Sequence, residues 1–346
     1  MPPTDERQLL GPVLRDVSRS FYKTLQLLPA RVRKPISLAY LLARTTDTIA
    51  DTELIPASER LEALKMLRTH VKGSQREALS FSILAAKQAS TAEKLLLERV
   101  NDIVALLETL SATDRDLVRK VLDTITSGQE LDLERFGLAT AENPTALQSA
   151  EELDDYTFRV AGCVGEFWTR ICLAHLFSEA TLKTGWLIEK GIRFGKGLQL
   201  VNVLRDVPAD LRKGRCYLPA EGLARLGLQP RDLLDPKNEA RLRPVYDEWL
   251  GRAKDHLRAG WEYTTALPWS AFRVRLACAL PILIGTETLA LLHSGPILDP
   301  ERRIKVSRRQ VKRAFRRSIF YYPFPRLWKA LGPAQTTSEL SPSKRV

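Results

Sequence analysis

The chain has 346 residues, of which 44% are apolar and 27% charged, and its formal net charge is +12. Such an apolar share excludes a disordered chain, and 18 Gly with 20 Pro exclude collagen-like or low-complexity sequence. The four cysteines and four histidines stand far apart with no C-x-x-C pair, which argues against a disulfide framework and against a structural zinc site. The length allows one large domain or two ordinary ones.

Taken in chain order, the sequence is helical in pattern nearly throughout. The start, MPPTDERQLL, carries early acids and lacks an apolar run, so we expect no signal peptide and a cytoplasmic protein. Apolar residues recur with helical spacing over 95–110 and 117–125, and Ser111 is a good N-cap for the second stretch. Strand-like alternation with hairpin turns is absent. We therefore predict one all-α domain over residues 1–325, followed by a basic, flexible tail over 326–346.

The first segment that carries chemistry runs from Ser37 to Asp51. If it is helical, Tyr40, Arg44, Asp47 and Asp51 fall at i, i+4, i+7 and i+11, which is one face of the helix. Most other positions are apolar or small. The pattern indicates a buried helix with a narrow polar stripe rather than a surface helix.

The second such segment runs over residues 197–210. Here Gln199, Asn202, Asp206 and Asp210 share one face, and the intervening positions are mostly Leu or Val. Pro208 disfavours α geometry at the residue before it, so we expect a kink ahead of Asp210.

The paired D-x-x-x-D spacings predict a metal site. Buried carboxylates repel one another unless a cation neutralises them, and Mg²⁺ binds one or two carboxylates together with substrate phosphates. Two such faces would hold Mg²⁺ ions that bind a diphosphate between them. The alternative is two exposed i,i+4 pairs, but both copies lie on apolar helices and each has a nearby arginine, Arg44 or Arg205.

The segment 276–293 is the best candidate for a membrane span, but Pro281 interrupts it and Glu287 lies near its middle. We therefore expect a buried helix pair there. Beyond it, residues 301–346 carry 13 Lys/Arg against 2 Glu, and five aromatics follow the basic run within 318–331. Aromatic rings beside cations are typical of a membrane interface. Contact with nucleic-acid phosphates and a merely solvated helix face are the alternatives, and we expect no nucleic-acid partner because no DNA- or RNA-binding motif occurs elsewhere.

Four motifs, in this order, resemble those of the squalene and phytoene synthases: S-R-S-F (18–21), D-T-I-A-D (47–51), Y-x-x-x-V-A-G-x-V-G (156–165) and Q-x-x-N-x-L-R-D-x-x-x-D (199–210). The resemblance covers about residues 18–293, with a weaker echo over 304–308. It implies an isoprenoid-synthase fold, a single-domain helical bundle around a central apolar cavity. It also implies Mg²⁺-dependent head-to-head joining of two farnesyl diphosphates to presqualene diphosphate, followed by NADPH-dependent reduction to squalene.

Within that family the D-T-I-A-D form looks closest to a bacterial squalene synthase, without the membrane helix of the eukaryotic enzymes. A phytoene or dehydrosqualene synthase without NADPH is the alternative, and a non-catalytic assembly or scaffold relative is a third. From the basic aromatic segment we expect peripheral contact with the inner face of the membrane, and we expect a monomer. Ala277 departs from the family, whose members often have an aromatic residue before C-A-x-P.

The resemblance also implies a role for each matching residue. Tyr156 resembles the tyrosine that helps remove the proton closing the cyclopropane, and Asp47, Asp51, Asp206 and Asp210 would be catalytic Mg²⁺ ligands. The residues implied for substrate binding are Ser18, Arg19, Ser20, Phe21, Tyr40, Arg44, Gln199, Asn202, Arg205, Lys213, Arg215 and Tyr217. Those implied for NADPH are Asn202, Arg205, Lys305 and Arg308.

Overall fold

The structure is a computed structural model that describes residues 6–18, 21–75, 77–177 and 183–333. Within these ranges the strands are β1 (Thr145–Ala146) and β2 (Arg215–Cys216), which pair in parallel. The rest of the regular structure is helical, as the sequence predicts. The strand pair ties the loop after residue 136 to the loop after residue 211.

The N-terminal half packs short helices around two long ones, α4 and α9. Its helices are α1 (Glu6–Gln8), the π-helical η1 (Leu9–Val13), α2 (Leu14–Ser18), α3 (Phe21–Leu27), α4 (Ala30–Ala50), α5 (Ala57–Lys72), α6 (Ser82–Ala86), α7 (Thr91–Glu98), α8 (Val100–Leu107) and α9 (Ala112–Phe136). The Ser111 side chain accepts a hydrogen bond from the backbone N–H of Asp114 at 3.2 Å and so caps α9, as predicted.

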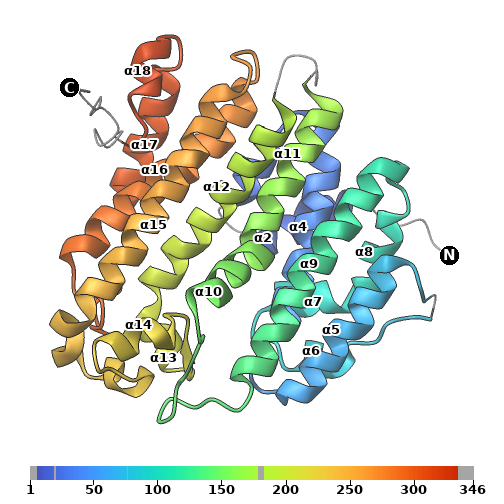
Figure 1. Cartoon of the computed structure of the whole chain (residues 1–346). Coiled ribbons are helices and arrows are strands. Elements are labelled where there is room, and N and C mark those ends of the chain that lie inside the picture. The colour runs from blue at the N-terminus through green and yellow to red at the C-terminus, as the bar shows by residue number, and fades with distance from the viewer. Residues whose placement is uncertain (1–5, 19–20, 76, 178–182, 334–346) are drawn as a thin grey trace.

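The C-terminal half is dominated by three long helices, α12, α15 and α16. Its elements are α10 (Ala150–Thr157), the π-helical η2 (Phe158–Gly162), α11 (Cys163–His175), α12 (Thr184–Arg205), α13 (Val207–Leu211), α14 (Ala220–Arg225), η4 (Pro230–Leu234), η5 (Pro236–Asn238), α15 (Glu239–Ala266), α16 (Phe272–Ser294), α17 (Arg308–Phe320) and α18 (Pro325–Lys329). Figure 1 shows the main helices side by side in the order α17, α16, α15, α12, α11, α9, α5.

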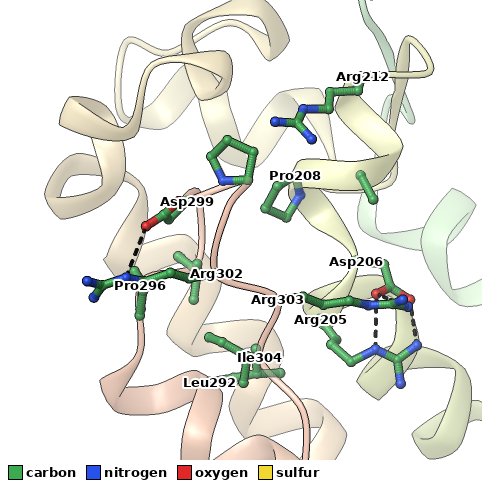
Figure 2. Close-up of a pocket in the computed structure, with 13 residues that line it drawn as sticks. Arg205, Asp206, Pro208, Arg212, Leu292, Pro296, Asp299, Arg302, Arg303 and Ile304 are labelled. Carbon is green, nitrogen blue, oxygen red and sulfur yellow. Dashed lines mark hydrogen bonds and ion pairs between the residues drawn. The ribbon is translucent and has the colours of Figure 1, made fainter.

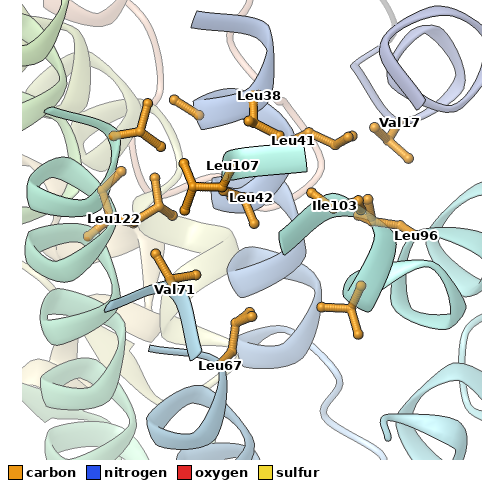
Figure 3. Packing of buried hydrophobic residues seen from close by; sticks show 14 of the residues in the cluster. Val17, Leu38, Leu41, Leu42, Leu67, Val71, Leu96, Ile103, Leu107 and Leu122 are labelled. Atoms are coloured by element: carbon orange, nitrogen blue, oxygen red, sulfur yellow. The ribbon is translucent and has the colours of Figure 1, made fainter. Parts of the chain in front are cut away.

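The core of the N-terminal half forms where α4 turns its apolar residues towards α5, α8 and α9. Leu38, Leu41 and Leu42 of α4 are fully buried, and Figure 3 shows them among Leu67 of α5 and Leu107 of α8. Burying each such leucine contributes roughly 1.5–3 kcal/mol. Because this face of α4 is fixed by packing, the polar face at the end of the same helix is held in one orientation.

Glycines let α12 lie against the backbone of η2 and α11. A Cβ on Gly195 would lie 2.0 Å from the Ala161 carbonyl oxygen, and one on Gly165 would lie 1.9 Å from that of Gly191. Side chains larger than hydrogen do not fit at either point. This close approach sets the distance between the helix that carries Gln199 and the segment that follows Tyr156.

The helix α16 is the one helix among the described residues that is long and apolar enough to cross a membrane. More than half of its most apolar stretch is buried, and it packs against α12, α15 and α17. Its composition therefore matches the interior of this bundle, which confirms the predicted burial. The predicted helix pair is wrong, however, because α16 continues through Pro281 as one helix.

The packed chain continues past residue 325, where we expected the flexible tail to begin. Trp328 is fully buried, and the Trp261 Nε1–H donates to the Lys329 carbonyl oxygen at 2.9 Å. The sequence made the aromatics of this region look like one exposed group, whereas some of them complete the core. Residues 334–346 of the predicted tail lie outside the described part.

Candidate active site

A polar cavity of about 130 Å³ lies between α4, α9 and the end of α10. It is lined by Asp47, Ala50, Asp51, Gly128, Gln129, Asp132, Leu133, Tyr156, Val160, Arg215 and Tyr217. Five of these residues, Asp47, Asp51, Tyr156, Arg215 and Tyr217, belong to the predicted site. The long-range packing of the two halves thus brings together residues that are up to 170 positions apart in the sequence.

Asp47 is the most deeply placed carboxylate of the first D-x-x-x-D pair. Burial, reinforced by the nearby charge of Asp51, raises the pKa of Asp47 to about 6, although Arg44 and Gln129 oppose the shift. The Gln129 Nε2–H donates to Asp47 Oδ1 at 2.6 Å. A cation placed beside such a carboxylate would strongly stabilise its ionised form.

Asp132 is a fifth carboxylate of the site, and the sequence reasoning missed it. Burial raises the pKa of Asp132 to about 6, against the opposing effects of Tyr217 and Arg215. The Tyr217 hydroxyl donates to Asp132 Oδ2 at 2.6 Å, while the other oxygen, Oδ1, is buried without a partner. The available signal was the polar pair Gln129 and Asp132, which lie three residues apart and so share one face if the helix predicted over 117–125 continues.

Two tyrosines stack at the wall of the cavity. The rings of Tyr156 and Tyr217 lie 4.5 Å apart at an interplanar angle of 26°. The Gln199 Nε2–H donates to the Tyr156 hydroxyl oxygen at 3.2 Å, so α12 and α10 both position this hydroxyl. Burial first, then the charge of Asp132, raises the pKa of Tyr156 well above its usual range, so the side chain is a neutral phenol.

The second D-x-x-x-D pair spans the break that Pro208 introduces. The helix α12 ends at Arg205, and α13 starts at Val207, so the predicted kink is present. The Asp210 backbone N–H nevertheless donates to the Asp206 carbonyl oxygen at 2.9 Å, which keeps the helical spacing between the two aspartates. Burial first, then the charges of Asp206 and Asp132, raises the pKa of Asp210 to about 7, against Arg215 and Lys213.

Asp206 faces a second pocket, of about 70 Å³, beside the segment 296–304. Figure 2 shows the guanidinium groups of Arg205 and Arg303 converging on its carboxylate. Arg205 Nε donates at 3.0 Å and Arg303 Nη2 at 3.2 Å, both to Oδ1. These two arginines outweigh the effect of burial and hold the pKa of Asp206 below its usual range. The two aspartates of this pair therefore have opposite electrostatic environments.

Several predicted substrate-binding residues have protein partners instead of facing the polar cavity. Arg44 forms an ion pair with Glu93, and Lys213 with Glu53 at 2.8 Å. The buried Ser18 hydroxyl donates to the Leu14 carbonyl oxygen at 2.5 Å. The arginine still acts on the site through its charge, because it lowers the pKa of Asp47.

The remaining predicted residues lie at the edges of the site or outside it. Asn202 lies one turn after Gln199 on α12, and Tyr40 is half-buried against the N-terminal core. Lys305 and Arg308 are exposed; Lys305 lies just before α17, and Arg308 is its first residue. Arg19 and Ser20 lie outside the described residues, as does the side chain of Phe21.

The oxygen donors fit a hard divalent cation. Asp132 Oδ1 and Gln129 Oε1 are buried without hydrogen-bond partners, and burial and like charges raise the pKa of Asp47 and Asp210. Carboxylate and amide oxygens are the ligand types that Mg²⁺ prefers. Among the described residues, no three His, Cys, Asp or Glu side chains converge on one point, so protein groups would have to share the ions with a ligand that carries its own oxygens.

An apolar cavity of about 200 Å³ shares the helical segment η2 with the polar one. Val160 of η2 lines the polar cavity, and the next residue, Ala161, lines the apolar one. Its walls are Thr24, Ala161, Val164, Gly165, Trp168, Gly191, Phe194, Gly195, Leu198, Tyr263, Ala277, Cys278 and Pro281. The central apolar cavity implied by the sequence is thus present between α11, α12 and α16. A carboxylate-lined site that can hold divalent cations, together with an apolar cavity in the same bundle, suits an amphiphile with a metal-binding anionic head and a hydrocarbon tail.

Comparison with known proteins gives a consistent picture. The squalene/phytoene synthase family matches residues 14–310. The 15-cis-phytoene synthase of Synechocystis is 31% identical over 70% of this chain and 64% of its own length, and the squalene synthase of Saccharomyces cerevisiae is 24% identical over 82% and 61%. A bifunctional lycopene cyclase/phytoene synthase of Blakeslea trispora matches over only 33% of its length, at 29% identity.

Solved structures support the fold. The structure of TcSQS with the ligand E5700 has a TM-score of 0.73 at 20% identity, covering 94% of this chain and 92% of that one. A dehydrosqualene synthase in complex with a ligand has a TM-score of 0.63 at 19% identity, over 92% and 99%. With these likenesses and the family match over most of its length, the chain belongs to the squalene/phytoene synthase family, whose members are prenyltransferases.

Proposed function

We propose that the chain catalyses the Mg²⁺-dependent head-to-head condensation of two farnesyl diphosphates to presqualene diphosphate. The observation that carries this proposal is that one helical segment, η2, contributes to both cavities: its Val160 lines the carboxylate-lined one and its Ala161 the apolar one. A diphosphate head belongs in the first and a prenyl tail in the second. The resulting allylic cation needs a dry environment, which the apolar walls supply.

The aspartates would hold the metal. Asp47 on α4, Asp51 just after its end, Asp206 just before α13 and Asp210 on α13 would supply oxygens, with Asp132 as a further donor on α9. Bound Mg²⁺ would neutralise the negative charge that develops on the leaving diphosphate. Arg215, close enough to Asp132, Asp51 and Tyr217 for its charge to act on them, would stabilise the same charge from the protein side.

Tyr156 is our candidate for the group that accepts the proton lost as the cyclopropane ring closes. Gln199 orients its hydroxyl, and the stacked Tyr217 connects the pair to the Asp132 carboxylate. A neutral phenol oxygen accepts a proton only in passing, so a nearby carboxylate that can take the charge is an advantage. The raised pKa of Asp132 makes it a better proton acceptor than an ordinary aspartate.

We further propose that NADPH reduces presqualene diphosphate to squalene. The support is the second pocket, which Arg205, Arg212, Arg302 and Arg303 line and where they offer cationic partners for phosphates. Lys305 adjoins this pocket, and Arg308 follows it. NADPH would supply the hydride, and these side chains would bind its anionic groups. Asn202 would lie on the same side of α12 as Arg205. The competing candidate is a phytoene or dehydrosqualene synthase, favoured by the phytoene synthases among the relatives.

A non-catalytic scaffold relative is a less suitable candidate. All four D-x-x-x-D aspartates are present, and three of them, with Asp132, are placed around one site. We propose a cytoplasmic monomer that contacts the inner face of the membrane peripherally through its C-terminal region.

The test is incubation of the purified chain with farnesyl diphosphate and Mg²⁺, with and without NADPH, and analysis of the products. We expect presqualene diphosphate without NADPH and squalene with it. Geranylgeranyl diphosphate serves as the competing substrate. A product profile that ignores NADPH, or consumption of the C20 substrate alone, would replace the squalene assignment with the phytoene type.

A further inference from the structure

The aromatic residues near the C-terminus form two groups with different roles. In the first group, Trp328 stacks on Trp261 with ring centroids 4.9 Å apart, and its Nε1–H donates to the Ser318 carbonyl oxygen at 3.0 Å. Tyr322 stacks on Trp269 at 4.3 Å. The Arg275 guanidinium lies 4.6 Å from the Trp328 ring and is itself buried. These rings fasten α17 and α18 rigidly to α15 and α16.

The second group points away from the bundle. Phe320 is 70% exposed, and Phe324 and Leu327 are each 52% exposed. They lie at the end of α17 and around the turn into α18, at the upper left of Figure 1. Ile319, beside them, is 41% exposed. Four large apolar side chains exposed within nine residues of a firmly packed segment favour a surface that another phase or molecule covers.

The charge around this cluster identifies the partner. The helix α17 has six basic residues and no acidic one. Its Val311, Ala314 and Ser318 side is partly or fully buried, which turns Arg309, Lys312 and Arg316 outward together with Phe320. No described carboxylate pairs with these three cations. Their charges are therefore not neutralised within the described chain and are free to attract an anionic surface.

We propose that the outward face of α17, together with Phe320, Phe324 and Leu327, is a docking surface for an anionic lipid bilayer. The cations would lie at the headgroup level, and the three apolar side chains would enter the acyl boundary. Nucleic-acid phosphates would pair with the cations but leave the apolar cluster in water. This proposal rests on the proposed function in one respect: an apolar product such as squalene would pass most readily from a docked enzyme into the lipid.

The experiment uses the full chain and co-sedimentation with vesicles of phosphatidylcholine alone or mixed with phosphatidylglycerol. We expect binding only to the anionic vesicles, weakened by salt. Replacing Arg309, Lys312 and Arg316 with Gln should weaken it roughly tenfold or more. The matched control is Arg231→Gln with Lys237→Gln, two exposed cations elsewhere, which should leave binding unchanged.

The apolar cluster is tested separately. The triple change Phe320→Ser, Phe324→Ser and Leu327→Ser should lose most vesicle binding even at low salt, whereas Leu138→Ser, at a 99% exposed leucine outside the surface, should not. Circular dichroism and Tm confirm that each variant is folded. Equal vesicle binding by the triple Ser variant and the wild type overturns the proposal. It is also overturned if RNA abolishes the vesicle binding of the wild type and the triple Ser variant still binds vesicles.

Two further readouts separate this proposal from its alternatives. Light scattering would detect a wild-type dimer that the triple Ser variant dissolves, and that outcome would assign the face to a second copy of the chain. Turnover of farnesyl diphosphate in solution should be the same in the wild type and all surface variants. A chain that binds vesicles but lacks turnover would overturn the proposed function and leave the docking surface standing.

Discussion

Replacing Asp132 with Asn should stabilise the fold while slowing the reaction. Burial raises the pKa of Asp132 to about 6, so keeping it ionised at neutral pH works against folding. Asn has nearly the same shape, and its amide oxygen still accepts the hydrogen bond from the Tyr217 hydroxyl. With about 1.4 kcal/mol per pKa unit, the variant should gain roughly 1–3 kcal/mol in free energy of unfolding near pH 8. For this chain length that corresponds to about 1–4 °C in Tm.

The gain should depend on pH in a defined direction. A carboxyl whose folded pKa is raised contributes stability below its unfolded pKa and loses that contribution as the pH rises through the folded value. The advantage of the Asn variant should therefore be complete above about pH 7 and disappear as the pH falls through 6 towards 4. Thermal unfolding of the metal-free protein across this range measures it.

Asp123, on the same helix, is the matched control. The Arg68 and Lys72 side chains outweigh the effect of burial and hold the pKa of Asp123 below its usual range. Asp123→Asn should therefore destabilise the protein at neutral pH, and the deficit should shrink as the pH falls. An Asp132→Asn variant that is less stable than the wild type at pH 8, or one with full condensation activity, would refute the reasoning.

Three further changes test other parts of the site. Tyr156→Phe should lower the rate of presqualene diphosphate formation by roughly tenfold or more in steady-state assays, with the circular dichroism spectrum unchanged and the reductive half-reaction less affected. Arg303→Gln should lower the Mg²⁺ concentration for half-maximal rate about two- to fivefold, because an exposed ion pair of ~0.5–1 kcal/mol no longer competes for Asp206; an unchanged Mg²⁺ titration would show that the pair is irrelevant to the metal. Gly195→Ala should lower the Tm, since the new Cβ would lie 2.0 Å from the Ala161 carbonyl oxygen, whereas Gly251→Ala, with open space around it, should not.

Much of the fold was predictable because its information is local. The helical periodicity, the Ser111 cap and the kink at Pro208 depend on neighbouring residues. The cap, the kink and the helix over 117–125 are confirmed, whereas the stretch 95–110 is divided at Arg99 between α7 and α8. The end of the domain could not be predicted from the sequence. The burial of Trp328 depends on Trp261 and Arg275, which are more than 50 positions away.

The site was predictable to the extent that motifs reveal it. The spacing predicted the shared placement of Asp47 and Asp51 at the cavity, while the resemblance implied Tyr156 and Arg215. Asp132 was missed because it belongs to no repeated carboxylate pair, and its role follows only from the packing of α9 against α4. Arg303 was missed because its partner, Asp206, is 97 positions away and the segment between them gives no sign of the contact.

The most direct test of the account is Mg²⁺-dependent release of diphosphate from farnesyl diphosphate by the wild type and by Asp47→Asn. The wild type should release diphosphate only when Mg²⁺ is present. The variant, which keeps the shape but removes a charge from the centre of the polar cavity, should fall by orders of magnitude while its helical content stays the same. Near-normal release by a folded Asp47→Asn variant, or release by the wild type without a divalent cation, would contradict the central claim that these carboxylates hold the metal.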